Sequence, residues 1–236
     1  MNDLSSVFAH RHVVLPVIHV ADEEQALRNT GIARDAGADG VFLIGHGMNA
    51  DSLLAIHAVV FERNRDWWIG VNCLGLSPAD VFTRVDNTIA GVWIDNALID
   101  ERTDSQPEAE RVLEIRKQNP WEGLYFGGVA FKYQRLVTDL AAAAGVAAGY
   151  IDVVTTSGDA TGVAANLKKI RAMKEQLGDH PLAIASGITP ENVSDYLDSA
   201  DCFLVATGIA DSFNELNPVK AQELVEEVRQ WDTERT

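Results

Sequence analysis

The sequence predicts one (β/α)8 TIM-barrel domain over residues 1–236, with the barrel proper at about 13–232. Two observations predict this α/β fold. Short runs rich in β-branched and aromatic residues alternate with longer segments of helical periodicity, and eight such units follow one another. The short runs are also apolar nearly throughout, as expected of parallel strands that are buried on both faces. A doubly wound open sheet is the alternative.

The predicted strands share a high apolar content, and most are followed by small or polar residues. In chain order they are Val13–Ile18, Gly40–Ile44, Trp67–Asn72, Gly91–Asp95, Gly123–Val129, Tyr150–Thr155, Leu182–Ser186 and Cys202–Ala206. In a barrel of this kind the carboxyl ends of all strands meet at one mouth, where active sites lie.

Between and after these strands, apolar residues recur at the spacing of amphipathic helices. A capping residue followed by proline marks helix starts at Ser77-Pro78, Thr189-Pro190 and Asn217-Pro218. The predicted helices are Asp22–Ala36, Asp51–Arg63, Pro78–Asn87, Glu108–Gln118, Gln134–Ala144, Asn166–Leu177, Pro190–Leu197 and Pro218–Trp231.

Composition limits the classes of partner. Hydrophobic residues make up 47% of the chain, enough for one sizeable core, and no Gly/Ser/Pro-rich linker divides it. A net charge of −16 opposes binding to nucleic acid or to anionic membranes, which both depend on clustered Lys and Arg. No segment is long and apolar enough to insert into a membrane. A homo-oligomer is compatible with this composition.

Cysteine usage and the N-terminal residues favour a cytoplasmic protein. Only Cys73 and Cys202 occur, far apart and without the spacing of zinc ligands, so neither a disulfide nor a metal site is predicted. The first residues lack the basic and apolar regions of a signal peptide. Gly45-His46-Gly47 lacks the remaining glycines of a dinucleotide fingerprint, and no cofactor is predicted.

A phosphate site is predicted after the last two strands. Ser186-Gly187 and Thr207-Gly208 each follow an apolar strand, at the place where barrels of this class usually hold phosphate. The glycines allow backbone N–H groups to approach a ligand, and the hydroxyls can donate hydrogen bonds. A helix starting at Pro190 would add its N-terminal N–H groups. The alternative is a pair of ordinary strand-to-helix turns.

Three titratable residues are predicted at the reacting end. Lys132 follows strand five and can neutralise a phosphate, act as an acid or form a Schiff base. Asp95 ends strand four and is the leading acid/base candidate, and His19 follows strand one. Each also has a structural alternative: a solvated lysine, a loop-capping carboxylate, and a hydrogen-bonded histidine. His46, after strand two, has the same two interpretations as His19.

Further polar residues at strand ends are candidates for contacts with the rest of the substrate. Asn72 and Asn96 follow strands three and four and carry amide groups, which can also satisfy loop backbone. After strand six come Thr156, Ser157 and Gly158, within a small, polar segment that can fold over a ligand or remain a plain loop.

The chain resembles the BtpA family, whose name comes from a member implicated in photosystem I biogenesis. The run Ile151-Asp-Val-Val-Thr-Thr-Ser-Gly-Asp-Ala-Thr-Gly162 resembles the family's Asp-x-(Val/Ile)-(Ile/Val)-Thr-Gly-x-x-Thr-Gly, and Ala185-Ser-Gly-Ile-Thr-Pro-Glu-Asn192 resembles its Gly-Ser-Gly-Val-Thr-x-Glu-Asn. Gly70-Val-Asn72 and Lys132 match more weakly. The resemblance implies a (β/α)8 barrel but carries no settled reaction with it.

The chain departs from the family pattern at two places. The Pro-rich loop expected after His19 is missing, and Ile209-Ala-Asp-Ser stands where a lysine is expected after Thr207. The Ser-Gly and Thr-Gly pairs also resemble phosphate-binding barrels of tryptophan, histidine and thiamine biosynthesis. We therefore expect a barrel that binds a small phosphorylated metabolite, a phosphosugar or phosphoribosyl compound, and acts on it as a lyase, isomerase or transferase. The alternative is a non-catalytic, BtpA-like assembly or regulatory factor.

Overall fold

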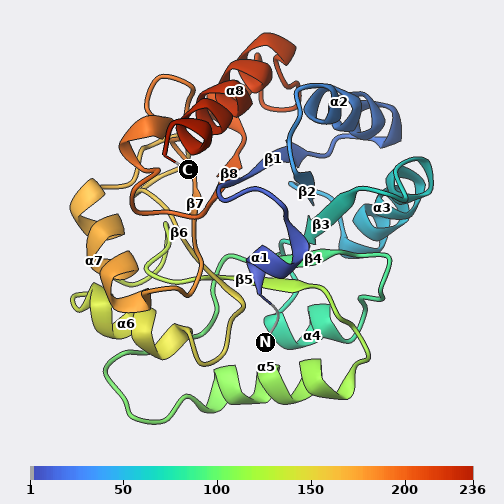
Figure 1. Ribbon diagram of the computed structural model, residues 1–236. Coiled ribbons are helices and arrows are strands. Elements are labelled where there is room, and N and C mark those ends of the chain that lie inside the picture. The colour runs from blue at the N-terminus through green and yellow to red at the C-terminus, as the bar shows by residue number, and fades with distance from the viewer. Residues whose placement is uncertain (1–2, 236) are drawn as a thin grey trace.

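A computed structural model describes residues 3–235, so residues 1, 2 and 236 of the predicted domain lie outside it. Eight parallel strands, β1 to β8, pair in sequence order, and β8 pairs with β1 to close the barrel (Figure 1). The predicted (β/α)8 fold is confirmed, and the open sheet is excluded.

All predicted strands are present, and their bounds differ from the predicted ones by three residues or fewer. They are β1 (Val13–His19), β2 (Gly40–Ile44), β3 (Trp68–Asn72), β4 (Gly91–Ile94), β5 (Leu124–Gly128), β6 (Val153–Thr156), β7 (Leu182–Ala185) and β8 (Cys202–Val205).

Helices α2 to α8 surround the barrel and cover its outer face, whereas the short helix α1 lies over one end (Figure 1). They are α1 (Leu4–Val7), α2 (Glu23–Asp35), α3 (Ala50–Arg63), α4 (Pro78–Phe82), α5 (Pro107–Gln118), α6 (Leu140–Ala147), α7 (Leu167–Leu177) and α8 (Pro218–Glu234). Helix α4 ends earlier than predicted, and α6 begins six residues later than the predicted Gln134.

The predicted helix Pro190–Leu197 is wrong. Only a short 3-10 turn, Val193–Asp195, forms in this segment. The Asn192 side chain accepts a hydrogen bond from Thr189 N–H and donates one to the Gly187 carbonyl (2.9 and 2.8 Å). These local bonds compete with helix formation. They also occupy the Thr189 amide that a helix start would have turned toward a ligand.

Two apolar clusters stabilise the fold. One lies between strands and helices, and the other fills the barrel interior, where Phe42, Trp68 and Phe126 meet edge to face. At the amino ends of the strands, Leu4 and Phe8 join the interior cluster, and the Phe8 and Trp68 rings lie 5.4 Å apart. The short helix α1 therefore closes this end of the barrel.

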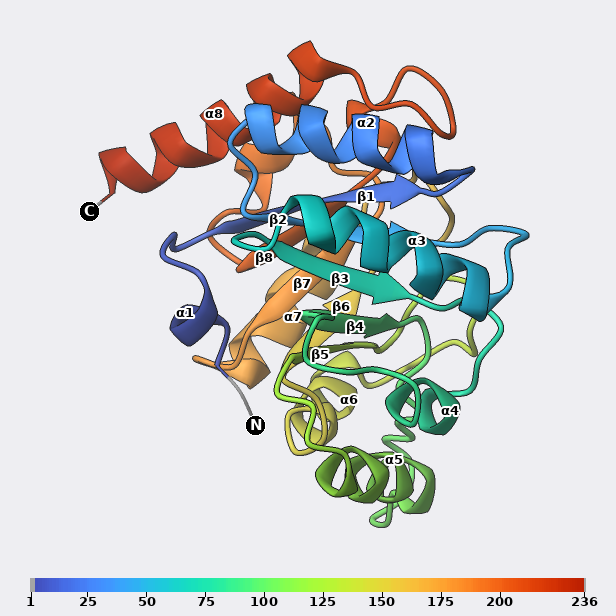
Figure 2. The ribbon, with the colours of Figure 1, turned by 90° about the vertical axis from the view of Figure 1, so that its right-hand side faces the viewer.

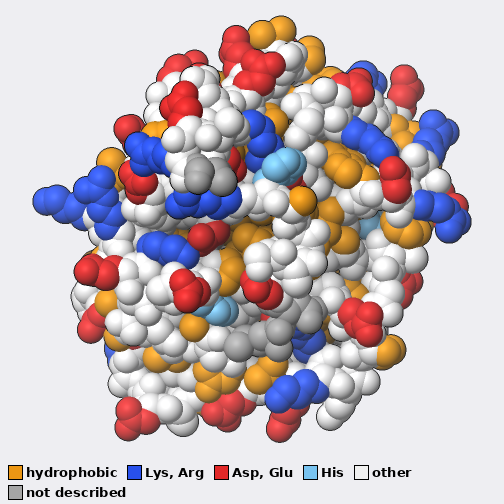
Figure 3. Space-filling model, in the orientation of Figure 1, with side chains coloured by type: hydrophobic (Ala, Val, Ile, Leu, Met, Phe, Trp, Pro, Cys, Tyr) orange, Lys and Arg blue, Asp and Glu red, His pale blue; other side chains and the backbone are white. Residues whose placement is uncertain are grey.

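Figure 2 shows α1 at one end of the barrel and the strand arrowheads pointing to the other. Figure 3 shows the end covered by α1, where acidic and basic side chains are mixed over the surface. Since this end is closed by the N-terminal segment, the opposite mouth is where a ligand could enter. Among residues 3–235, no helix is long and apolar enough to cross a membrane.

Candidate active site

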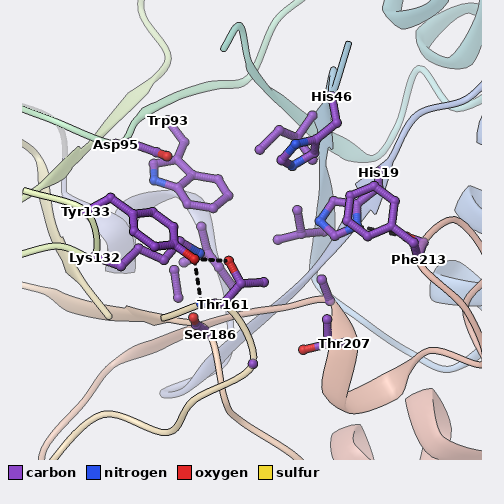
Figure 4. A pocket seen from close by; sticks show the side chains of 16 residues that line it. His19, His46, Trp93, Asp95, Lys132, Tyr133, Thr161, Ser186, Thr207 and Phe213 are labelled. Carbon is purple, nitrogen blue, oxygen red and sulfur yellow. Dashed lines mark hydrogen bonds between the residues drawn. The ribbon is translucent and has the colours of Figure 1, made fainter. Parts of the chain in front are cut away.

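A cavity of about 260 Å³ opens at the carboxyl ends of the strands (Figure 4). Its lining comes from strands on both sides of the barrel and from the loops that follow them. The lining residues are Val17, His19, Ile44, His46, Trp93, Asp95, Lys132, Tyr133, Thr161, Gly162, Ala185, Ser186, Leu204, Ala206, Thr207 and Phe213. Five of the predicted site residues are thus brought together: His19, Asp95, Lys132, Ser186 and Thr207.

Asp95 lies just after β4, on one side of the cavity (Figure 4). Asn72, at the end of β3, donates a hydrogen bond to its carboxylate (2.9 Å). Burial raises the pKa of the Asp95 carboxyl, and the hydrogen bond from Asn72 opposes that rise. Asn72 is therefore a residue that orients Asp95, and it does not line the cavity itself.

Lys132 reaches the same cavity from the loop after β5. Its backbone N–H donates to Ser157 Oγ (2.8 Å), which ties this loop to the one after β6. Burial lowers the pKa of the Lys132 ammonium, while the Asp95 charge acts in the opposite direction. Asp95 and Lys132 thus have pKa values displaced toward each other, the pattern expected of acid/base groups.

Lys169 on α7 is a half-buried cation that the sequence did not single out. Its Nζ donates to the carbonyls of Ala130 and Ser157, the latter at 2.8 Å, and so joins the loops that carry Lys132 and Ser157. Burial lowers the pKa of the Lys169 ammonium to about 8. Lys169 contacts the loops from behind, so we assign it a positioning role.

His19 lies across the cavity from Lys132 (Figure 4). Its Nδ1 is 2.8 Å from the Phe213 carbonyl oxygen, which can only accept, so Nδ1 carries the proton. Burial lowers the pKa of His19, which favours the neutral ring. The other ring nitrogen, which points into the cavity in Figure 4, then has a free lone pair. His46 packs edge-on against His19, with ring centroids 4.9 Å apart.

Hydroxyl groups line the side of the cavity nearest β7 and β8. Ser186 and Thr207 follow these two strands, and Thr161 comes from the loop after β6 (Figure 4). Tyr133 Oη lies 3.4 Å from Thr161 Oγ1, so the β5 and β6 loops meet over this side. In Figure 4, Lys132 lies beside Tyr133 and Thr161, and Thr207 lies on the same side as His19, so hydroxyls and titratable groups face one shared cavity.

The two glycines predicted to approach a phosphate fit tightly against other backbone. A Cβ at Gly187 would overlap the Ala164 amide, and one at Gly208 would overlap the Ile188 carbonyl. Gly187 also has a positive φ of 71°. Glycine is needed at both positions to bring the loops together, and neither residue lines the cavity. Their predicted N–H contacts to phosphate stay predictions.

The other residues predicted to contact the substrate make hydrogen bonds or packing contacts within the loops. Asn96 accepts a hydrogen bond from Leu98 N–H (3.0 Å), and Thr156 donates to the Ala130 carbonyl (3.2 Å). Ser157 supports Lys132, and Gly158 packs against the Val163 carbonyl. Among the described residues, none of these four lines the cavity, and their predicted substrate contacts remain untested.

Several lining residues were not predicted. Trp93 is the inward-facing residue of β4 two positions before Asp95, a spacing that could have identified it. Tyr133 and Phe213 lie in loops, where no periodicity indicates the path of the chain. Thr161 belongs to the polar segment after strand six that the sequence offered as a loop able to fold over a ligand.

The closed parallel barrel, with a cavity at the carboxyl ends of its strands, defines a TIM-barrel protein. The sequence profile of the BtpA family matches residues 78–230, and the chain belongs to this family. An uncharacterized protein of Thermococcus kodakarensis is 30% identical over 228 residues, which covers 86% of this chain and 84% of that protein.

Solved structures of similar fold include two enzymes. The chain matches (S)-3-O-geranylgeranylglyceryl phosphate synthase from Thermoplasma acidophilum, in complex with sn-glycerol-1-phosphate, at a TM-score of 0.67 and 15% identity, covering 98% of this chain and 100% of the enzyme. It also matches phosphoribosyl anthranilate isomerase from Thermus thermophilus, at a TM-score of 0.65 and 12% identity, covering 93% of this chain and 99% of the enzyme. At these identities the likeness establishes the fold alone.

Proposed function

We propose that this protein binds a small phosphorylated metabolite, a phosphosugar or phosphoribosyl compound, and transforms it as a lyase, isomerase or transferase. One observation carries the proposal: a single cavity combines a hydroxyl-lined side with titratable groups whose pKa values are shifted by burial. The substrates named for the two enzymes of similar fold, a glycerol phosphate and a phosphoribosyl compound, give further support.

The phosphate is assigned to the side of Ser186 and Thr207, with backbone N–H groups of Gly187 and Gly208 as additional donors. In a strongly acidic protein a phosphate needs a local cation, and Lys132 is the lysine that lines this cavity. Anchoring the phosphate holds the rest of the substrate near Asp95 and His19.

The reacting end is assigned to Asp95, Lys132 and His19. Asp95, with its raised pKa, can hold a proton closer to neutral pH than an ordinary carboxyl and so can act as acid or base. His19 offers a lone pair as a base. Lys132 acts as a charge clamp. A Schiff-base role for Lys132 would leave an adduct that borohydride traps, whereas the clamp leaves none.

A thermal-shift screen of phosphorylated metabolites, each paired with its unphosphorylated counterpart, tests the proposal. A ligand at 100 times its Kd adds about 2.7 kcal/mol to the free energy of unfolding. We expect larger shifts with the phosphorylated member of each pair, and we expect Thr207→Val to reduce this difference. Thr83→Val, at the exposed C-cap of α4, is expected to leave it unchanged. Equal shifts with both members of each pair would contradict the phosphate site.

The non-catalytic alternative rests on the segment after Thr207, where Ile209, Ala210, Asp211 and Ser212 supply no cation. It predicts ligand binding without turnover. Incubation of each binding compound with the protein, followed by mass spectrometry of the products, separates the two functions.

A further inference from the structure

We propose that the ligand carries a flat apolar ring, which occupies the deep part of the cavity while its phosphate stays near the hydroxyl-lined side. The ring narrows the substrate class to ring-bearing phosphate esters. This inference rests on the proposed function for the phosphate, but its evidence comes from a different part of the cavity.

The floor of the cavity is apolar. Val17, Ile44, Ala185 and Leu204 belong to the buried cluster inside the barrel and form the top layer of it. Aliphatic side chains offer no hydrogen bond, so a sugar hydroxyl placed against them would lose its bonds to water without replacement. The floor therefore favours an apolar group over a polyol.

Trp93 also belongs to the floor, and it contributes one hydrogen-bond donor that has no partner. Its indole N–H is buried and has no hydrogen-bond partner among residues 3–235. Indole can donate but cannot accept. The floor side chains Val17, Ile44, Ala185, Leu204 and Trp93 therefore offer no acceptor for a ligand hydroxyl. Trp93 adds one large aromatic surface, and its N–H can donate to an acceptor atom on the edge of a ring.

Aromatic rings also form the walls. In Figure 4, Trp93 and Tyr133 lie on one side of the cavity, with His19, His46 and Phe213 on the other. His19 is stacked on Phe213 with ring centroids 4.1 Å apart and an interplanar angle of 24°. Tyr133 and Phe213 are both exposed, so they form the outer part of the walls. Rings in this arrangement pack favourably against a planar ligand.

The size of the cavity suits such a molecule. An apolar cavity of about 150 Å³ is sufficient to bind benzene. The 260 Å³ available here therefore holds a ring of that size with room left for a phosphate. The floor is apolar, whereas the polar groups lie above it beside the outer rings of Tyr133 and Phe213, so the ligand is expected to be anionic at one end and apolar at the other.

Four probes test the ring and the phosphate separately: inorganic phosphate, glycerol 1-phosphate, phenyl phosphate and phenol, titrated calorimetrically into the full-length protein. Burial of a phenyl group stabilises binding enough to lower Kd about 10-fold or more. We expect phenyl phosphate to bind at least about 10-fold more tightly than glycerol 1-phosphate, and we expect inorganic phosphate and phenol each to compete with it.

Two variants connect the result to this cavity. Phe213→Ala removes an exposed ring of the wall and is expected to reduce the preference for phenyl phosphate without affecting folding. Leu136→Ala removes an exposed apolar side chain outside this cavity and is expected to leave the preference unchanged.

Binding of glycerol 1-phosphate as tightly as phenyl phosphate would overturn the ring while leaving the phosphate site standing. If phenol competes with phenyl phosphate but inorganic phosphate does not, the apolar floor would be supported and the phosphate assignment overturned. An unchanged preference in Phe213→Ala would show that the ring is not held between these aromatic walls and would also overturn the inference.

Discussion

Gly128 is the last residue of β5, and Gly128→Ala would place a methyl group where the ends of β4 and β5 are in contact. A Cβ at Gly128 would lie 3.1 Å from the Asp95 Cα and would overlap the Asp95 carbonyl group. The Ala97 N–H donates to the Gly128 carbonyl at 3.0 Å, so the two segments are already held in contact. The glycine therefore allows the backbone of Asp95 to approach the strand that leads to Lys132.

The size of the effect follows from the overlap. Carbon atoms prefer separations of about 3.5–4.0 Å, so the backbone of Asp95 has to move by on the order of 1 Å. Overpacking of this kind costs about 1–3 kcal/mol. For a chain of this length, 1 kcal/mol corresponds to about 2–4 °C in Tm, so we expect Gly128→Ala to melt about 2–12 °C below the parent.

Thermal unfolding followed by circular dichroism measures this change, with Gly31→Ala as the matched control. Gly31 lies inside α2 with no atom within 4 Å of an added Cβ, so the same chemical change is expected to raise Tm slightly. If Gly128→Ala melted at or above the parent temperature, the close contact between the strand end and Asp95 would be refuted.

Three further variants test the site. Lys132→Met is expected to raise the Kd of the best phosphorylated ligand by about 10–150-fold, because one charge-assisted hydrogen bond is lost. The control Lys220→Met, at an exposed lysine, is expected to leave Kd unchanged. Calorimetric values equal to the parent's would remove Lys132 from the site. Asp95→Asn keeps the shape of the side chain but removes its basicity, so turnover is expected to fall about 10²–10⁴-fold with binding little changed; unchanged turnover would contradict its role. Lys169→Met tests the pKa of about 8, which lies below the ordinary 10.5. Between these pH values residue 169 binds more protons in the unfolded parent chain than in the folded one. The free energy of unfolding of the parent therefore rises with pH, and the variant should lack this rise. Urea unfolding of both proteins at pH 8 and pH 10 measures the change in the free energy of unfolding, and an equal increase in both would contradict the lowered pKa.

The barrel could be predicted from the sequence because each strand is short, apolar and separated from the next by a helical segment. The same pattern places Asp95 and Lys132 at strand ends, and therefore at the mouth. Local bonds were harder to foresee. The segment after Pro190 has a helix start signal, but the side chain of Asn192 takes the backbone groups that a helix would use.

The walls of the cavity could not be predicted, because they depend on loops that are distant in sequence. His19 and Phe213 are 194 positions apart, and only the closure of β1 on β8 brings their loops together. Lys169 was missed for a related reason: its place on an amphipathic helix is typical of a solvated lysine, yet its ammonium turns inward to two loop carbonyls. Tertiary packing determines both features.

A crystal structure of the full-length protein with inorganic phosphate tests the central claim most directly. The account predicts phosphate in the cavity at the barrel mouth, within hydrogen-bond distance of the Ser186 and Thr207 hydroxyls and facing Lys132. A phosphate bound at another surface, or a cavity that holds only water at saturating phosphate, would contradict it.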